Sequence, residues 1–254
     1  MDLLKITNVT KIFGALKALD NVSFSLKKQE FLGLIGPNGA GKTTLFNIIS
    51  GTYPVTSGEI FFNGQNLTSL KSYKRPYFSI GRTFQNIKLF YDLSVIENVM
   101  LGRHPKTKAN LWHAAMRLPL HYQEEKETKR KVMETLDFLE ISSLAHERAG
   151  DLPYGQQRLV EVARALVMEP MLLLLDEPCA GLNPHETNEL EKKLRLTNES
   201  GISILCVEHN MKMIMNISDR IIVLNYGKKI SAGSPQEVGK DPDVVQAYLG
   251  KHGE

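Results

Sequence analysis

The sequence predicts an α/β fold, and two observations carry this prediction. Two continuous apolar runs, Met171–Leu175 and Ile202–Val207, are separated by a stretch with helical spacing. Runs of this length are typical of strands buried on both faces of a parallel sheet. A third run, Phe31–Ile35, leads into a glycine-rich loop and then into a helical pattern. Strands that alternate with helices in this way define the α/β class.

The composition is that of a globular chain with a sizeable core: 254 residues, 42% hydrophobic and 23% charged, with a formal net charge of +3. This mild charge does not indicate nucleic acid or anionic lipid as a partner. No apolar stretch approaches the roughly 20 residues that a membrane span needs, and the N-terminus lacks an apolar signal core. We therefore expect no transmembrane segment and no signal peptide. We expect reduced thiols at Cys179 and Cys206.

The N-terminal third is predicted to form short strands joined by turns. Thr43–Ser50 has the apolar spacing of a helix, and Gly51 follows as a C-cap. Glu59–Phe62 followed by Asn63-Gly64 predicts a strand and a hairpin turn.

The middle of the chain is predicted to be helical. A capping box at Ser94–Glu97 opens a helix over Val95–Leu101. Glu124–Leu139 has an apolar stripe made of Val132, Met133, Leu136 and Leu139. Between them, Pro105–Tyr122, with Trp112 and Pro119, is expected to be irregular, either as a surface insertion or as an element that faces a partner.

A further helix is expected over Arg158–Val167, ended by Pro170, and a last strand pair at Arg220–Leu224 and Lys229–Ala232. The chain is thus expected to be one domain over 1–254. Its α/β part with the short N-terminal strands takes 1–85 and 158–232, a helical subdomain takes 86–157, and a helical tail takes 233–254.

One loop matches the pattern G-x-x-x-x-G-K-[ST] in full. Its residues are Gly36, Pro37, Asn38, Gly39, Ala40, Gly41, Lys42, Thr43 and Thr44. Glycines let backbone N–H groups approach phosphate oxygens, and the helix N-terminus adds unpaired donors and partial positive charge. Lys42 can reach the β- and γ-phosphates, and the Thr43 hydroxyl can ligate Mg²⁺. The loop predicts binding of a nucleoside triphosphate with Mg²⁺.

Two carboxylates follow the apolar strand that ends at Leu175, and Pro178 fixes the turn after them. Ligands of open α/β sheets bind beyond the carboxyl ends of the strands. Asp176 is placed to hold Mg²⁺. Glu177 is placed nearer the γ-phosphate, where its carboxylate can polarise a water molecule that attacks this phosphate.

Three further segments occur in a fixed order with the phosphate loop and the acid pair: Thr83-Phe84-Gln85, Leu152-Pro153-Tyr154-Gly155-Gln156 and Val207-Glu208-His209. In this order the whole chain resembles the nucleotide-binding subunits of ABC transporters. The resemblance implies a P-loop NTPase (RecA-like) core with an N-terminal antiparallel β subdomain and an inserted α-helical subdomain. It also implies ATP and Mg²⁺ as cofactors.

The resemblance assigns roles to individual residues. Gln85 would be a catalytic residue and Mg²⁺ ligand, His209 the catalytic switch histidine, and Phe13 the aromatic that stacks on adenine. The signature residues Leu152, Pro153, Tyr154, Gly155 and Gln156 would contact the ATP of a partner subunit. Ala180, Gly181, Leu182 and Asn183 would form the D-loop. Taken singly, Gln85 is an ordinary polar residue, a histidine such as His209 is more often structural, and an aromatic such as Phe13 is more often part of a core.

The chain departs from the family pattern at two places. Pro153 and Tyr154 replace the usual serine and first glycine of the signature, and Asn183 replaces the D-loop aspartate. Pro153 offers neither a hydroxyl nor an N–H to a phosphate. One site of a heterodimer is therefore a candidate for weaker hydrolysis.

The segments Arg82–Phe90, Glu177–Pro184 and Val207–Met211 resemble the ATPases of branched-chain amino-acid importers, of the LivG type. This implies a second ATPase subunit in a homo- or heterodimer, two transmembrane permease subunits and, indirectly, a solute-binding protein. It also implies a peripheral location on the cytoplasmic face of the cell membrane. Urea, amide and lipopolysaccharide transport remain alternative cargoes.

A soluble ABC ATPase acting on nucleic acid is a second alternative. Such proteins carry a long coiled coil or two cassettes in one chain, whereas this sequence has one cassette and a short insertion. We therefore expect no nucleic-acid partner. The absence of an Asn-Lys-x-Asp motif disfavours a GTPase.

An apolar cluster adjoins Gln85 and consists of Phe84, Leu89, Phe90 and Tyr91. Two interpretations stay open: the cluster helps to form the groove on which the membrane subunits dock, or it belongs to the core of the helical insertion.

Overall fold

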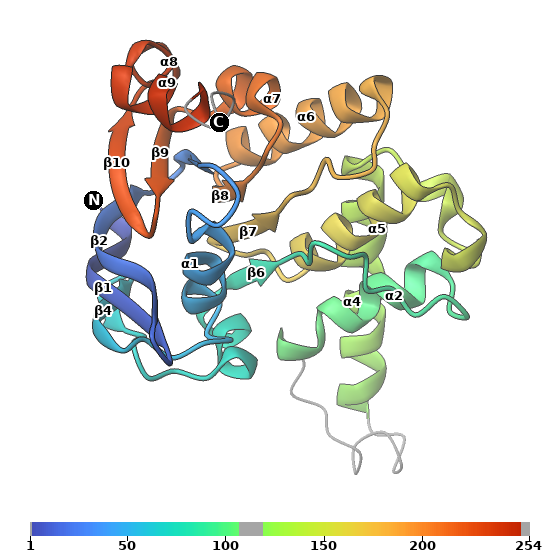
Figure 1. Cartoon of the computed structure of the whole chain (residues 1–254). Helices are drawn as coiled ribbons and strands as arrows, with labels where there is room; N and C mark the ends of the chain where they lie inside the picture. The colour runs from blue at the N-terminus through green and yellow to red at the C-terminus, as the bar shows by residue number, and fades with distance from the viewer. Residues whose placement is uncertain (1, 107–118, 250–254) are drawn as a thin grey trace.

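The computed structural model describes residues 2–106 and 119–249. Its centre is a six-stranded sheet in the order β10-β9-β3-β8-β7-β6 (Figure 1). The strands are β3 (Phe31–Ile35), β6 (Ile80–Arg82), β7 (Leu172–Asp176), β8 (Ser203–Val207), β9 (Arg220–Asn225) and β10 (Lys228–Gly233). All neighbours pair in parallel except β9 and β10. The predicted α/β class is confirmed, and β6 is a strand that the sequence did not predict.

The central sheet is buried on both faces, as its apolar strands predict. Along β3, Phe31 and Ile35 belong to one hydrophobic cluster, whereas Leu32 and Leu34 belong to another on the opposite face. Successive side chains of a strand point to opposite faces, so one short run anchors both layers. The side chains of β7 and β8 alternate between the same two clusters, so the carboxyl ends of all three strands are anchored in both layers.

The second sheet is antiparallel, in the order β2-β1-β4-β5. Its strands are β1 (Asp2–Phe13), β2 (Leu16–Lys27), β4 (Ser57–Phe62) and β5 (Gln65–Asn66). The prediction of short strands is wrong for β1 and β2, which have 12 residues each. Each strand has one irregular position. Asn8 in β1 and Asn21 in β2 have positive φ, and the β1–β2 register shifts beside them. The predicted turn between β4 and β5 at Asn63-Gly64 is confirmed.

Helices of the inserted part lie to one side of the central sheet, on the right in Figure 1. They are α2 (Val95–Gly102), α4 (Pro119–Phe138) and α5 (Tyr154–Leu166). The capping box of Ser94 and Glu97 is confirmed. Pro119–Tyr122 is helical, so the expectation of irregular structure is wrong there, because proline is favoured in the first turn of a helix. Trp112 lies outside the described residues.

The helix expected to begin at Arg158 begins at Tyr154 instead. Pro153 precedes it with φ −54° and ψ 150°, and a proline with no N–H to lose is readily placed at such a boundary. Tyr154, Gly155 and Gln156 therefore form the first turn of α5 rather than a loop before it. A boundary between residues 157 and 158 would cut this helix.

The remaining helices are α1 (Lys42–Ile49), α6 (Pro184–Glu199), α7 (Met211–Ile217), α8 (Pro235–Lys240) and α9 (Pro242–Leu249). Short 3₁₀ turns lie at Ser72–Phe78, His104–Lys106, Ser142–Leu144 and Ala149–Asp151. In the C-terminal tail, α8 and α9 extend the helical structure as far as Leu249. None of the helices in the described ranges is both long and apolar enough to cross a membrane. Cys179 and Cys206 are free and buried.

Candidate nucleotide site

The phosphate loop connects β3 to α1 at the carboxyl edge of the central sheet. Two glycines let it lie close to neighbouring strands. At Gly36, with φ 152°, a Cβ would stand 2.1 Å from the Leu224 carbonyl oxygen. At Gly41, with φ 101°, it would stand 2.7 Å from the Ala18 carbonyl oxygen. Any side chain at these positions would push the loop away from the sheet.

Lys42 lies inside this loop and is 6% exposed. Its Nζ donates to the Gly36 carbonyl at 2.7 Å and to the Pro37 carbonyl at 3.0 Å. Burial lowers the pKa of the ammonium, and the negative charge of Glu177 opposes this shift. The lysine is a largely desolvated cation, and a desolvated cation interacts more strongly with a phosphate than a hydrated one does.

Glu177 joins two of the predicted catalytic residues. Gln85 Nε2 donates to Glu177 Oε2 at 3.0 Å, and His209 Nε2 lies 2.9 Å from Glu177 Oε1. Glu177 has a left-handed φ of 48° and its N–H donates to the Val207 carbonyl at 2.8 Å. The left-handed backbone of Glu177 follows directly on the end of β7 at Asp176. Residues 85, 177 and 209, far apart in sequence, form one cluster.

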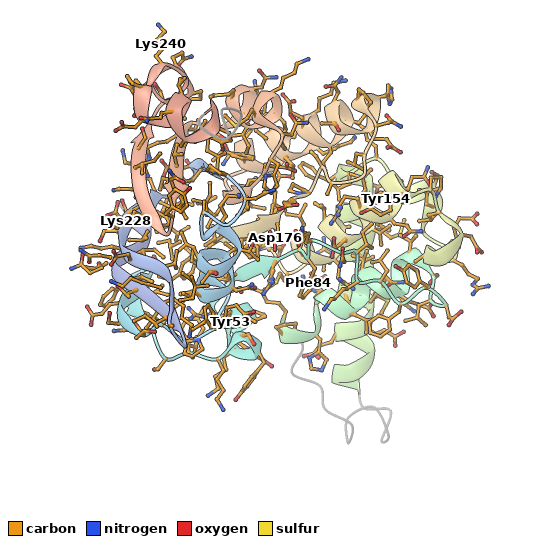
Figure 2. All side chains as sticks on the ribbon, in the orientation of Figure 1. Tyr53, Phe84, Tyr154, Asp176, Lys228 and Lys240 are labelled. Atoms are coloured by element: carbon orange, nitrogen blue, oxygen red, sulfur yellow. The ribbon has the colours of Figure 1, made fainter. Side chains whose placement is uncertain are left out.

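Asp176 ends β7 and is 4% exposed. Burial raises the pKa of its carboxyl, and Arg82 acts in the opposite direction. Its Oδ1 is buried and has no hydrogen-bond partner within the described parts of the chain. A buried carboxylate oxygen without a partner is costly and suits a cation, so the residues present fit Mg²⁺. Figure 2 shows Asp176 at the centre of the molecule.

A cavity of about 550 Å³ lies over the phosphate loop. Within it the structure brings together several predicted residues: Asn38, Gly39, Ala40, Gly41, Lys42, Thr43, Thr44, Gln85, Glu177 and His209. In the described ranges, no group of three or more histidine, cysteine or acidic side chains could hold a metal ion. A cation here would depend on Asp176, hydroxyl groups and the ligand's own oxygens.

Phe13 does not line this cavity. Its ring packs edge to face against Tyr53, with 5.4 Å between centroids, and it stays 40% exposed. The cavity lining that does not come from the phosphate loop or the catalytic candidates is made by Leu16–Ala18 and by Tyr226 and Gly227 in the β9–β10 turn. Tyr226 is 78% exposed, and the sequence patterns did not single it out.

Glu208 is a buried residue that organises the site without facing the cavity. Its Oε2 accepts from the N–H groups of His209 and Asn210, and its Oε1 accepts from the Cys179 N–H at 2.7 Å. The carboxylate thereby ties the segment after β8 to the turn after β7. Sequence reasoning missed this role because the glutamate adjoins a more conspicuous histidine.

The signature segment, which we define as Leu152–Gln156, lies away from the phosphate loop. Pro153, Gly155 and Gln156 border a different cavity, of about 480 Å³, together with Leu182 of the expected D-loop. Asn183 caps α6, its side chain accepting from the N–H groups of His185 and Glu186. No residue of the signature segment lines the cavity over the phosphate loop.

A groove of about 590 Å³ opens between the 3₁₀ turn at residues 72–78 and the inserted helices. Phe84 and Phe90 line it, and Phe90 is 57% exposed. Leu89 is 8% exposed and belongs to the core, so the expected apolar cluster is divided between groove and core. Tyr91 is 50% exposed and lies outside the groove lining.

Arg82 is one of the residues that line this groove. Its guanidinium donates to the hydroxyls of Ser50 and Thr52 at 2.7 and 2.8 Å, and it lies over the Phe84 ring at 4.7 Å. Burial lowers its pKa, and the charge of Asp176 opposes the shift. Arg82 thus lines the groove, and its positive charge also opposes the rise in the pKa of Asp176 in the nucleotide site.

Comparisons with known proteins agree with this geometry. A family model described as "ABC transporter" matches residues 19–180, and a model described as "Branched-chain amino acid ATP-binding cassette transporter" matches residues 228–254. The high-affinity branched-chain amino acid transport ATP-binding protein LivG of Escherichia coli K12 is 40% identical over 250 residues, covering 98% of each chain.

Two solved structures are also similar. One is the ADP conformation of an ATP-binding cassette of an ABC transporter, with TM-score 0.86 and 33% identity over 98% of this chain and 99% of the other. The other is a dimeric post-hydrolysis cassette bound to ADP and phosphate, with TM-score 0.77 and 28% identity over 91% and 98%. Because the family model spans more than half of the chain and the LivG relative is similar over nearly its whole length, the chain belongs to the ABC transporter family, as an ATP-binding cassette.

Proposed function

We propose that this chain is the ATP-hydrolysing subunit of an importer for branched-chain amino acids. The observation that carries the ATPase assignment is the cluster of Gln85, Glu177 and His209 at the edge of the phosphate-loop cavity. The cargo assignment is supported by the match of residues 228–254 to the branched-chain model and by the similarity to LivG. These matches favour amino acids over urea, amides or lipopolysaccharide.

Hydrolysis requires a water molecule placed in line with the γ-phosphate and a group that accepts its proton. Glu177 is contacted by Gln85 at one carboxylate oxygen and by His209 at the other, and it is proposed to polarise that water. His209 would stabilise the charge that develops on the γ-phosphate, and Lys42 would bind the β- and γ-phosphates. Bound Mg²⁺ would neutralise phosphate charge, held by Thr43, Asp176 and Gln85.

A second ATPase subunit is proposed to complete the site. The signature segment of this chain does not reach its own phosphate-loop cavity, which supports its use on the nucleotide of a partner. A related cassette has been solved as a dimer with ADP and phosphate. Pro153 cannot donate to a phosphate, so the N–H groups of the first turn of α5 would supply the contact.

The groove lined by Phe84 and Phe90 is proposed to dock the two transmembrane subunits on the cytoplasmic face of the membrane. Its lining joins apolar side chains to the cations Arg82, Lys88 and Arg164. An exposed apolar surface with a charged margin is typical of a protein interface.

The function is tested by reconstituting this chain with its membrane and ATPase partners in liposomes. ATP hydrolysis should rise when a solute-binding protein loaded with leucine, isoleucine or valine is supplied. The Glu177→Gln complex is the negative control. Stimulation by urea or by lipopolysaccharide, and not by these amino acids, would reject the proposed cargo.

A further inference from the structure

A buried ion pair on α5 is not used by the proposed chemistry. Arg158 NH1 donates to Glu161 Oε2 at 2.8 Å, one helical turn away, and both side chains are 0% exposed. Burial raises the pKa of Glu161, and the charge of Arg158 opposes this shift. Buried pairs add little stability over apolar residues of similar volume. Net stabilisation therefore does not account for the pair, and the backbone groups that it binds are the better explanation.

The pair holds the backbone around Gln85. Arg158 NH1 donates to the Phe84 carbonyl at 2.8 Å, and NH2 donates to the Gln85 carbonyl at 2.9 Å. The Phe84 N–H donates to Glu161 Oε1 at 3.2 Å. Both donor and acceptor groups of this segment are thus bound to α5. From the same segment, the Gln85 side chain reaches Glu177 in the nucleotide site.

The same guanidinium also contacts the signature segment. Arg158 NH2 donates to the Tyr154 hydroxyl at 3.3 Å and lies over its ring, 5.8 Å from the centroid. Tyr154 is the first residue of α5, and its ring packs against Gly181 of the expected D-loop. Arg158 is therefore in direct contact with the Gln85 backbone and with Tyr154, which belongs to the segment proposed to face a partner's nucleotide. Figure 2 shows Tyr154 on the helical side and Phe84 nearer the centre.

We propose that Arg158, held by Glu161, is a positioning residue that couples the two nucleotide sites of the ATPase dimer. A shift of Gln85 on contact with Mg·ATP would be transmitted through the two carbonyl bonds to the first turn of α5, and from there to the nucleotide of the partner. A planar guanidinium can hold both carbonyls and the hydroxyl at fixed angles, whereas a lysine ammonium cannot. This inference rests on the proposed function and adds its regulation.

The test uses the reconstituted complex and three variants of this chain. Arg158→Lys keeps the positive charge but loses the planar guanidinium that bonds both carbonyls. The double variant Arg158→Met, Glu161→Leu removes the coupling and leaves an apolar interior of similar volume. The matched control is Arg130→Gln, Glu134→Gln, which removes an exposed ion pair on α4. Each complex is assayed for thermal unfolding, for ATP affinity and for the dependence of ATPase rate on ATP concentration.

The parent complex should respond cooperatively to ATP. In the Met/Leu variant we expect a lower melting temperature, because the Phe84 N–H and the Phe84 and Gln85 carbonyls lose their partners, and nearly unchanged ATP affinity. Its Hill coefficient should fall to about 1, because the coupling between the two sites is lost. The Hill coefficient of Arg158→Lys should lie between those of the parent and the Met/Leu variant, and the α4 control should match the parent.

Cooperative hydrolysis retained in the Met/Leu variant would overturn the proposal, and so would a non-cooperative parent complex. If the Met/Leu variant does not fold, Arg158→Lys decides alone, and parental cooperativity in it rejects the coupling. A parent complex without any ATPase activity would instead reject the proposed function, so the two failures are distinguishable.

Discussion

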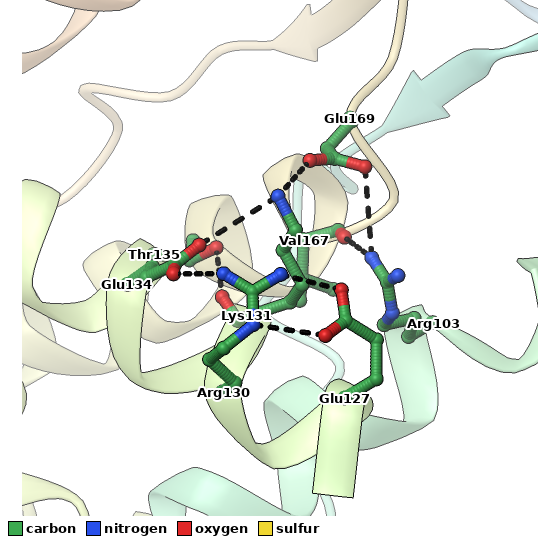
Figure 3. A network of polar contacts seen from close by, with 8 residues as sticks. All are labelled: Arg103, Glu127, Arg130, Lys131, Glu134, Thr135, Val167 and Glu169. Carbon is green, nitrogen blue, oxygen red and sulfur yellow. Dashed lines mark hydrogen bonds and ion pairs between the residues drawn. The ribbon is translucent and has the colours of Figure 1, made fainter. Parts of the chain in front are cut away.

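Two polar regions of this molecule differ in what their charges do. The network on α4 in Figure 3 joins Arg103, Glu127, Arg130, Lys131, Glu134 and Glu169 by ion pairs and hydrogen bonds. Its members are mostly about half exposed. The nucleotide site has fewer bonds, yet Lys42 and Asp176 are almost completely buried, and one Asp176 oxygen has no partner.

The difference teaches that the number of ion pairs is a poor guide to importance. Exposed pairs contribute about 0–1 kcal/mol each, because water and salt screen them. Charges in a partly buried site interact strongly, and leaving one without a partner is costly. We therefore expect large effects from single substitutions in the nucleotide site and small ones in the α4 network.

Glu177→Gln should give the largest effect. The amide cannot accept the proton of the attacking water, so turnover should fall by about 100-fold or more. ATP binding should be retained, because Gln85 and His209 still enclose a side chain of the same size. Steady-state ATPase assays and calorimetry measure the two quantities. Glu134→Gln makes the same chemical change in the α4 network and should leave both unchanged; near-normal turnover in Glu177→Gln would remove Glu177 from its assigned role.

Lys42→Ala should weaken ATP binding by about 10- to 100-fold, the value of one or two charge-assisted hydrogen bonds. The matched control is Lys17→Ala. Lys17 borders the same cavity, but its side chain is 51% exposed and paired with Asp20. Its removal should change affinity less than about twofold, as expected of a screened charge. Equal affinities for the two variants by calorimetry would show that burial does not distinguish these lysines.

Phe90→Asp should reduce co-purification with the membrane subunits about tenfold, because it places a charge in the apolar groove. ATP affinity of the isolated chain should not change. Phe138→Asp is the control, since Phe138 is 40% exposed on α4 and lies outside the groove lining. Unchanged co-purification of the Phe90 variant would exclude the groove as the docking site.

Lys131→Met should give the smallest effect, a loss of at most about 0.5 kcal/mol in the free energy of unfolding at pH 7. The Lys131 bond lowers the pKa of Glu169 from 4.5. A carboxylate with a lowered pKa contributes stability above its unfolded pKa and loses it as pH falls through the folded value. The difference from the parent should therefore persist down to pH 4.5 and close below it. Urea unfolding across this range measures it, and a loss above 2 kcal/mol would contradict the ranking of the two regions.

Local patterns were sufficient for much of the fold and for the phosphate loop. Phe31–Ile35 was predicted to the residue, because a buried strand, a glycine loop and a helix each leave a local pattern. β6 was missed because three residues are too short to show a period. The length of β1 and β2 was missed because the asparagines with positive φ resemble strand ends.

Roles that depend on long-range packing could not be predicted. Arg158 and Glu161 have the three-residue spacing of an ordinary exposed helix pair, and nothing local reveals that both are buried against Phe84 and Gln85. Arg82 likewise gains its role only when β6 is placed beside α1. Gln85 and His209 were predicted through a family resemblance, and Glu177 from its place after a buried strand. Their contacts with one another became visible only in the structure.

The unpartnered oxygen of Asp176 has a consequence for heat stability. The ligand-free protein carries the cost of a buried carboxylate, and a bound cation would remove it. Any ligand that binds only the folded state stabilises it by RT ln(1 + [L]/Kd), about 2.7 kcal/mol at a concentration 100 times Kd. The melting temperature should therefore rise with Mg·ATP concentration and serve as a direct gauge of how full the site is, without any transport assay.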